Sequence, residues 1–216
     1  TLTVTNRAAK YEITVQAKSG TYKYDGTEKT VEGIEKDTFT VNGNEYTVSG
    51  LEAKATETNA GDYTVNVTGT PVVKDSEGND VTSQFKVNTN SGELSIAKRD
   101  VVLTSATDSK EWDGKALTND EVIVSGDGFT ALQGATYNVT GTRTAVGSVD
   151  NTFDYILNSN TNAGNYNIEK KFGTLTVTNR AAKYEITVQA NSGTYKNGRT
   201  QNRTPGTKRN TVTGNR

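Results

Sequence analysis

The chain of 216 residues contains no cysteine, no histidine and no methionine. Without cysteine the protein has no disulfide bridge, no thiolate nucleophile and no metal site with thiolate ligands. Without histidine it lacks the usual general base near neutral pH and the commonest metal ligand in proteins. We therefore expect no catalytic residues and no metal or cofactor site. The lack of cysteine also favours a bacterial surface protein over a eukaryotic secreted one.

Other features are scarce as well. Pro71 and Pro205 are the only prolines, so glycine and asparagine must make most turns. No apolar run approaches the roughly 18 residues of a membrane helix, so we expect no membrane insertion of this segment. The formal net charge of −1 gives no reason to expect binding to nucleic acid. The 25 acidic residues fall on predicted turns and outer strand faces, not in the apolar setting that a glycosidase acid requires.

A long internal repeat is the main positive signal. Residues 1–23 return as residues 174–196, and Asn191 in place of Lys18 is the one difference among the 23 positions. A near-verbatim copy at such a distance is typical of a repeat array. In the second copy this stretch closes a unit, so residues 1–9 are predicted to be the terminal strand of a preceding repeat. We interpret the chain as a piece of a longer repetitive protein whose N-terminus lies upstream.

Apolar and polar residues alternate over much of the chain with the two-residue period of half-buried strands. The first such run is 11–17. Asn42-Gly43 lies between two alternating runs and predicts a tight hairpin, because both residues tolerate positive φ. A second hairpin is predicted between 85–87 and 94–96. The polar turn between these hairpins, DSEGND, lacks the spacing and distal glutamate of a calcium loop, so we interpret it as a plain turn.

A second, divergent unit carries similar signals. An aromatic-Asp-Gly motif occurs twice, 88 residues apart, and we interpret both copies as structural. The aspartate can cap the turn through a side-chain oxygen, the glycine can adopt positive φ, and the ring can pack on a sheet. Trp112 is then a packing variant of Tyr24 and not a sugar-stacking platform. The motif residues are Tyr24, Asp25, Gly26, Trp112, Asp113 and Gly114.

These signals divide the chain. Asn162–Tyr166 echoes Asn59–Tyr63, and each unit is predicted to hold six or seven short strands. The predicted parts are a terminal strand of a truncated repeat (1–9), a first β-module (10–98), a second β-module (99–180) and the start of a truncated third repeat (181–216). Neither join between units contains Gly or Pro, so we expect a stiff head-to-tail rod.

We expect an all-β fold with two tandem small antiparallel β-sandwich modules of immunoglobulin-like type and strand remnants at both ends. The alternative is a β-grasp-like arrangement with a short helix at 116–122 or 130–134. The turn spacing favours the sandwich. A low hydrophobic content of 31% suits several small sandwiches better than one large core.

After Lys196 the sequence departs from the repeat. Residues 197–216 contain one large apolar residue, Val212, no acid and five basic residues. A segment this polar cannot bury enough surface to offset chain entropy, so disorder is predicted. We interpret it as non-native sequence after a repeat, and the alternative is a basic arm that grips nucleic acid or an acidic wall polymer.

Four short motifs occur in order within about 80 residues: the aromatic-Asp-Gly motif, Val-Thr-Gly-Thr at 139–142, Asn-Ala-Gly-Asn-Tyr-Asn-Ile at 162–168 and Gly-Thr-Leu-Thr-Val-Thr at 173–178. Together they resemble the MBG/YDG-type repeats of large bacterial surface and adhesin-like proteins, in a form similar to those of gut Firmicutes. The resemblance covers the second unit well and the first more loosely. It implies extracellular, wall-attached, tandemly arrayed modules, and it brings no catalytic residues.

The preferred hypothesis is a non-catalytic stalk of an extracellular bacterial cell-surface protein, which holds a distal binding domain away from the cell. Its partners would be the neighbouring repeats of the same chain. One alternative is that the modules themselves bind host glycan or protein as an adhesin, which exposed aromatic residues clustered on one face would favour. Another is an accessory region of a carbohydrate-active enzyme whose catalytic domain lies elsewhere in the gene.

Overall fold

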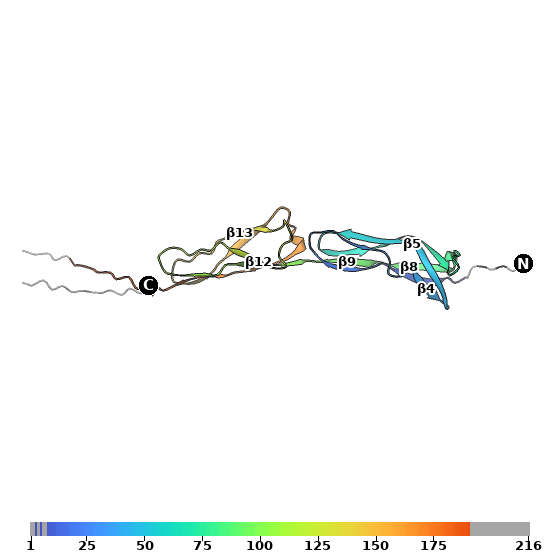
Figure 1. The fold of residues 1–216 in the computed structure, drawn as a ribbon, viewed down its shortest axis with the longest axis horizontal. Helices are drawn as coiled ribbons and strands as arrows, with labels where there is room; N and C mark the ends of the chain where they lie inside the picture. The colour runs from blue at the N-terminus through green and yellow to red at the C-terminus, as the bar shows by residue number, and fades with distance from the viewer. Residues whose placement is uncertain (1–2, 4, 6–7, 191–216) are drawn as a thin grey trace, which may run out of the picture.

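The computed structural model describes residues 3, 5 and 8–190, and this part of the chain is all-β (Figure 1). Residues 1–2, 4 and 6–7 of the predicted terminal strand at 1–9 lie outside the described residues, and the predicted disorder of 197–216 falls wholly outside them. Two short 3-10 helices, η1 (Thr82–Gln84) and η2 (Ala163–Asn165), accompany the strands. Neither 116–122 nor 130–134 is helical, so the short helix of the alternative β-grasp-like arrangement is wrong at both positions.

The strands fall into two groups along the chain. The N-terminal half contains β1 (Tyr11–Gln16), β2 (Gly20–Lys23), β3 (Lys29–Glu32), β4 (Thr38–Val41), β5 (Asn44–Glu57), β6 (Gly61–Val65), β7 (Val67–Asp75), β8 (Phe85–Asn90) and β9 (Gly92–Ala97). The C-terminal half contains β10 (Arg99–Ser105), β11 (Asp108–Glu111), β12 (Val122–Gly126), β13 (Ala135–Val139), β14 (Gly147–Asp150), β15 (Phe153–Leu157), β16 (Tyr166–Lys171) and β17 (Thr174–Thr178). Both halves exceed the expected six or seven strands, because the first and last strands of each are broken in two.

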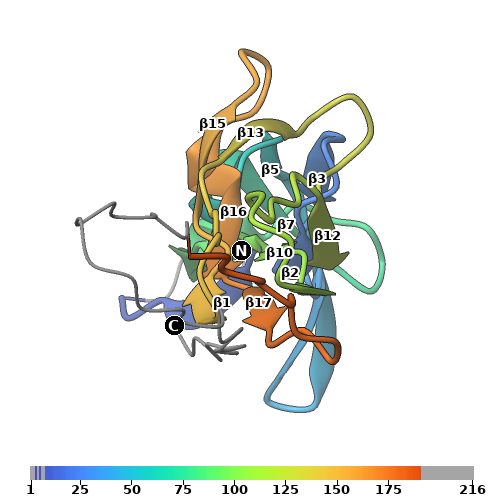
Figure 2. The same cartoon turned by 90° about the vertical axis from the view of Figure 1, so that its left-hand side faces the viewer.

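The sheets stay within each half. In the N-terminal half the strand orders are β1-β8, β2-β9-β6 and β3-β5-β4, with β7 also paired to β5. In the C-terminal half they are β12-β10-β16, β11-β17-β14 and β13-β15. Among the described strands no pair joins the two halves. The halves lie end to end, with the N- and C-terminal labels at opposite ends of a long molecule (Figure 1). The view along this axis superimposes strands of both halves (Figure 2).

Both halves share one framework of first and last strands. β1 pairs with β8 in parallel, with Tyr11 opposite Phe85, and β10 pairs with β16 in parallel, with Arg99 opposite Tyr166. The continuations β2-β9 and β11-β17 are also parallel. Equivalent positions lie 88 residues apart on the first strands (11 to 99) and 81 apart on the last (85 to 166). The expected purely antiparallel pairing is therefore wrong. A unit that the chain enters at one end and leaves at the other has first and last strands that run in the same direction.

Local sequence patterns explain the individual strands. Ile13 and Val15 of β1 are buried, and Glu12 and Thr14 that alternate with them are exposed, as the alternation predicts. The Asn42-Gly43 hairpin is confirmed: β4 and β5 pair antiparallel around it, and φ is 50° at Asn42 and 82° at Gly43.

The second predicted hairpin, between 85–87 and 94–96, is wrong. Among the described strands β8 pairs only with β1, and β9 pairs with β2 and β6, so the chain continues in one direction from one sheet to the next. Gly92 marks the crossing, where an added Cβ would overlap the carbonyl oxygen of Lys18 and lie 2.8 Å from that of Ala17. Gly173 has the equivalent place against the carbonyl oxygens of Ser105 and Ala106. The polar stretch 88–92 is therefore a point where the chain passes from one sheet to the next, and the chain does not turn back there.

The buried core does not stop at the boundary between the halves. Its largest cluster contains Ala17, Tyr24, Val31, Ala53, Val65, Leu94 and Ile96 from the N-terminal half and Val101, Leu103, Phe153 and Tyr166 from the C-terminal half. Smaller clusters occupy the two outer ends: Ile13, Val15, Val48, Val73 and Phe85 at one, and Leu117, Leu175 and Val177 at the other. The sheets therefore separate at Lys98, while the apolar core continues across it.

Candidate functional site

The aromatic-Asp-Gly turns close equivalent ends of the two halves. The backbone N–H of Tyr24 donates to the carbonyl oxygen of Ala97, and that of Trp112 donates to Thr178, both at 2.9 Å. Each aromatic residue thereby follows a first strand and bonds to the last residue of the paired last strand. Gly26 has a φ of 83°, and its counterpart in the second turn has the same value. The motif thus lies at the exit end of each half.

The aspartates cap both turns. Asp25 Oδ1 accepts from the backbone N–H of Thr27 at 2.9 Å, and Asp113 Oδ1 accepts from that of Lys115 at 2.9 Å. Lys29 Nζ lies 2.6 Å from Asp25 Oδ2. This hydrogen bond is the main reason that the pKa of Asp25 lies well below its usual range, and the bonds from Thr27 contribute.

Asp113 follows the same rule. Lys110 Nζ lies 2.9 Å from Asp113 Oδ1 and is the main cause of a lowered Asp113 pKa, with the Lys115 N–H as the second cause. Both turns therefore carry a carboxylate whose ionised form is favoured by a neighbouring lysine. Each lies on the surface, at the end where the chain leaves that half.

Tyr24 joins the two halves through its ring and its hydroxyl. It is only 3% exposed and packs edge-on against Tyr166 of the C-terminal half, with ring centroids 5.5 Å apart. Gln133 Nε2 donates to the Tyr24 hydroxyl at 2.9 Å, and the Tyr166 hydroxyl donates to Gln133 Oε1 at 2.5 Å. Gln133 thus connects two buried tyrosines, and Phe129 packs on the second of them at 5.2 Å.

The two Asn-Ala-Gly segments also meet at this junction. Asn165 is 2% exposed, and its Oδ1 accepts from the backbone N–H of Ala60 at 2.8 Å. Its Nδ2 donates to Asn59 Oδ1 at 2.9 Å. The echo between these segments therefore does not mark equivalent positions: one precedes β6 and the other leads into β16. They are partners across the junction.

Charged side chains form contacts at the surface of the junction. Lys23 Nζ lies 2.8 Å from Asp127 Oδ2, and this hydrogen bond is the main cause of a lowered Asp127 pKa. Arg99 donates to the carbonyl oxygens of Asp127 at 2.6 Å and Gly128 at 2.8 Å, which holds the loop after β12 against the join. Only Lys98 separates β9 from β10. The two halves are thus held by a one-residue join, a shared core and contacts on several sides.

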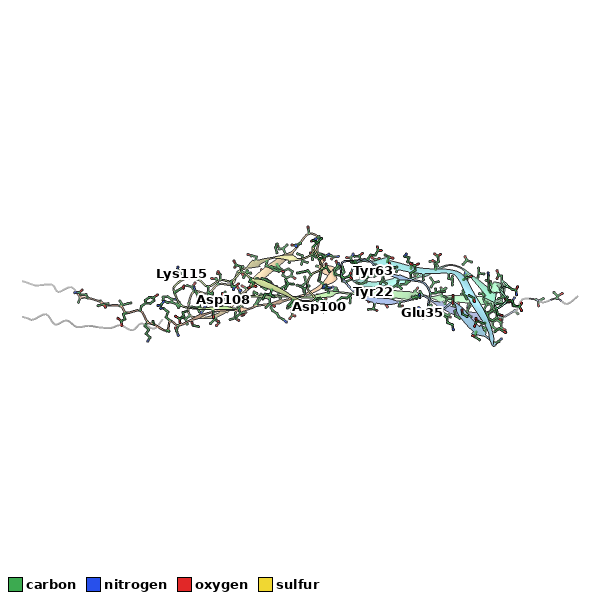
Figure 3. The ribbon with its side chains drawn as sticks, viewed as in Figure 1. Tyr22, Glu35, Tyr63, Asp100, Asp108 and Lys115 are labelled. Carbon is green, nitrogen blue, oxygen red and sulfur yellow. The ribbon has the colours of Figure 1, made fainter. Side chains whose placement is uncertain are left out.

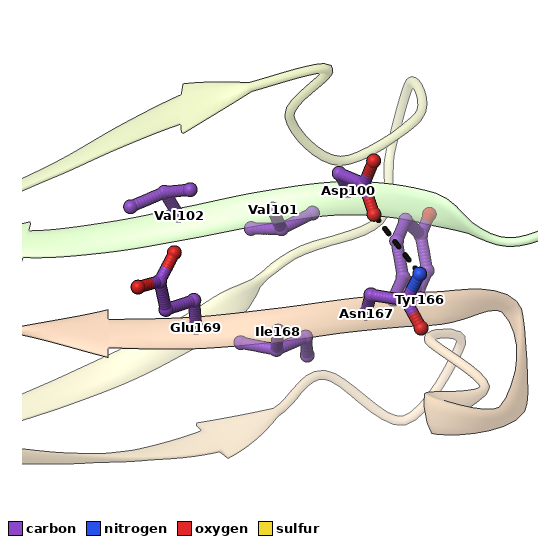
Figure 4. A pocket seen from close by; sticks show the side chains of 7 residues that line it. All are labelled: Asp100, Val101, Val102, Tyr166, Asn167, Ile168 and Glu169. Atoms are coloured by element: carbon purple, nitrogen blue, oxygen red, sulfur yellow. Dashed lines mark hydrogen bonds between the residues drawn. The ribbon is translucent and has the colours of Figure 1, made fainter.

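Side chains along the molecule show where this junction lies. Asp100 is near the middle of the molecule, with Tyr22 and Tyr63 on the N-terminal side and Asp108 and Lys115 on the C-terminal side (Figure 3). An open surface hollow of about 510 Å³ lies beside the junction, over the paired strands β10 and β16 (Figure 4). Its polar lining is Asp100, Asn167 and Glu169, and Asn167 Nδ2 donates to Asp100 Oδ1 at 2.9 Å.

Trp112 has a more open setting than Tyr24. It is 36% exposed, and its ring lies 6.3 Å from that of Tyr184 in an edge-on arrangement. The guanidinium of Arg180 lies 4.4 Å from the centre of the Tyr184 ring. The motif is therefore covered by the following half at Tyr24, whereas the ring partner of Trp112 among the described residues is Tyr184, in the segment after β17.

Sequence reasoning identified the two turns but missed their partners. Asn165 and Tyr166 belong to the Asn162–Tyr166 segment that resembles Asn59–Tyr63, and nothing in this similarity indicates that they face the N-terminal half. Gln133 and Asp127 lie in a loop whose sequence gives no signal of contact. In the described part of the chain no group of three or more acidic side chains is placed to hold a metal ion, and no helix is long and apolar enough to cross a membrane. No family model matches the chain, and neither a curated protein nor a solved structure matches it significantly.

Proposed function

We propose that the chain is a non-catalytic spacer, a stalk segment of an extracellular bacterial cell-surface protein that projects a distal binding domain. The observation that carries this proposal is the junction. A one-residue join, a shared apolar cluster and the Tyr24–Gln133–Tyr166 contact leave little freedom for one half to swing against the other. Such a junction gives a chain of modules length and stiffness, which are the physical requirements of a stalk.

Each half then corresponds to one module, 10–98 and 99–180, which we take to be a small immunoglobulin-like sandwich. The aromatic-Asp-Gly and Asn-Ala-Gly-Asn-Tyr motifs resemble those of MBG/YDG-type repeats. This resemblance supports a tandem array on a cell surface. The common parallel framework of β1/β8 and β10/β16 supports it as well, because it passes the chain from one end of a module to the other.

The stiffness can be measured directly, because the native chain has no cysteine. Spin labels on Glu35→Cys and Lys115→Cys, both exposed, span the junction, and labels on Glu35→Cys and Glu45→Cys lie within one half. Pulsed electron–electron double resonance should give distance distributions of similar width for both pairs of labels. Tyr24→Ala should broaden only the pair across the junction. A native distribution across the junction as broad as that of a flexible linker would refute the spacer function.

A second function is favoured by the surface hollow over the paired strands β10 and β16. Its carboxylates and amide are exposed hydrogen-bonding groups of the kind that contact sugar hydroxyls or polar protein side chains, so the module could adhere to host glycan or protein. Glycan and mucin arrays with the whole chain test this. Specific micromolar binding that Asp100→Ala and Glu169→Ala abolish would establish the adhesin function, and no binding above background would reject it.

A further inference from the structure

One ten-residue sequence occurs in two different structural settings. Residues 8–17 and 181–190 both read AAKYEITVQA. In the first copy Ile13 is 6% exposed and Val15 is fully buried. In the second copy the equivalent Ile186 and Val188 are 62% and 63% exposed. The same apolar side chains are thus core in one place and surface in the other.

The structure shows what covers the first copy. β1 pairs in parallel with β8 over six residues, from Tyr11 opposite Phe85 to Gln16 opposite Asn90. Its inward side chains pack in a cluster with Val48 and Val73. On the outside, Glu12 Oε1 lies 2.9 Å from Lys86 Nζ, which is the residue opposite Glu12 in this register.

We infer that residues 183–190 form an interaction strand, and that its partner is the N-terminal half of a second copy of this chain. The strand takes the place of β1 in the partner and pairs in parallel with the partner's β8. Its register is set by identity of sequence: Tyr184 lies opposite Phe85, and Glu185 lies opposite Lys86. No other occupant is as well defined, because the receiving surface accepts this same sequence in the structure.

The geometry makes the contact head-to-tail. The segment after β17 extends from the end of the molecule opposite to β1 (Figure 1). Insertion of the C-terminal strand of one copy into the N-terminal half of the next is a heterologous contact, which leaves a free strand on the second copy. In the native chain β1 is tethered beside β8 and outcompetes a strand from another molecule at low concentration. The contact therefore becomes measurable when β1 is disabled.

The test uses the full chain and one substitution at two positions with identical flanking sequence. Val15→Asp places a charge in the core and displaces β1, which opens the surface of β8. We expect this variant to form concentration-dependent oligomers of at least twice the 23.2 kDa monomer mass in light scattering. The double variant Val15→Asp/Val188→Asp should remain at monomer mass. Val188→Asp alone should be monomeric with native thermal stability, because Val188 is exposed.

A mixing experiment covers the case in which Val15→Asp does not fold its N-terminal half. Excess native chain should bind the isotopically labelled Val15→Asp variant one to one and restore slow hydrogen exchange at its Val48 and Val73 amides. The same excess of the Val188→Asp chain should do neither. Equal oligomer masses for the single and double variants, or no difference between native and Val188→Asp chains in the mixture, would overturn the inference.

Discussion

Gly173→Ala provides the sharpest test of the framework that both halves share. Gly173 lies where the last strand of the C-terminal half crosses the break in the first, and an added Cβ would overlap the carbonyl oxygens of Ser105 and Ala106. These are backbone atoms at the end of β10 and in the break that follows it, so no side-chain rotation relieves the overlap. The strands would have to separate.

The cost follows from the contacts that separation breaks. The Gly173 N–H donates to Ser105 Oγ at 3.0 Å, and its carbonyl oxygen accepts from Asn151 N at 2.8 Å. Overpacking costs about 1–3 kcal/mol, and each lost hydrogen bond costs about 0.5–1.5 kcal/mol. Gly173→Ala should therefore lower the free energy of unfolding by about 2–6 kcal/mol, a large share of the roughly 5–15 kcal/mol of a typical domain.

The assay is urea denaturation followed by circular dichroism and by the fluorescence of Trp112, the only tryptophan. Trp112 bonds to the end of β17 and reports on this framework. Gly78→Ala is the matched control: its φ is 87° and an added Cβ meets nothing within 4 Å, so only backbone strain of about 1–2 kcal/mol applies. Equal losses for Gly173→Ala and Gly78→Ala would show that the close approach of the strands does not matter.

Three further outcomes follow from the junction and the turns. Tyr24→Phe removes the hydroxyl that accepts from Gln133, and should cost about 1–3 kcal/mol in urea denaturation because a partly buried amide loses a partner. Asn165→Ala removes two bonds across the junction and should increase hydrogen exchange at the Ala60 amide, while amides of the β4-β5 hairpin stay unchanged. The lowered pKa values of Asp25 and Asp113 contribute stability above about pH 4, which is lost as the pH falls through the folded-state values. Asp25→Asn should therefore flatten the decline of the melting temperature below about pH 4, and an unchanged pH profile would contradict the turn-capping role.

Sequence reasoning predicted what short-range patterns determine. The alternation at β1 placed Ile13 and Val15 inside, and Asn42-Gly43 predicted the β4-β5 hairpin, because both signals act between residues that are close in the chain. The polar stretch 88–92 carries the same kind of turn residues, yet it leads from β8 into β9 without reversal. A cluster of turn residues indicates that a strand ends there. Whether the chain then reverses depends on which strands the two neighbouring segments pair with.

The contacts that build the junction were beyond such patterns. Gln133 is a polar residue in an irregular loop, and its importance arises from two tyrosines that lie 109 and 33 residues away in sequence. The aromatic-Asp-Gly pattern predicts a turn at Tyr24, but nothing local indicates that its ring is buried by a different half of the chain. Contacts between units depend on how whole units dock, and a single sequence contains little information about that.

The framework and the junction together explain why the two halves can differ so much in sequence. Equivalent positions lie 88 residues apart on the first strands and 81 on the last, so the C-terminal half is seven residues shorter in between (88 − 81 = 7). That difference falls in β3–β7 and β12–β15, which have different strand orders. The parallel first and last strands, the crossing glycines and the exit-end turn keep the same register in both. These parts determine where the chain enters and leaves, so the middle of a unit can diverge without changing how one unit follows the next.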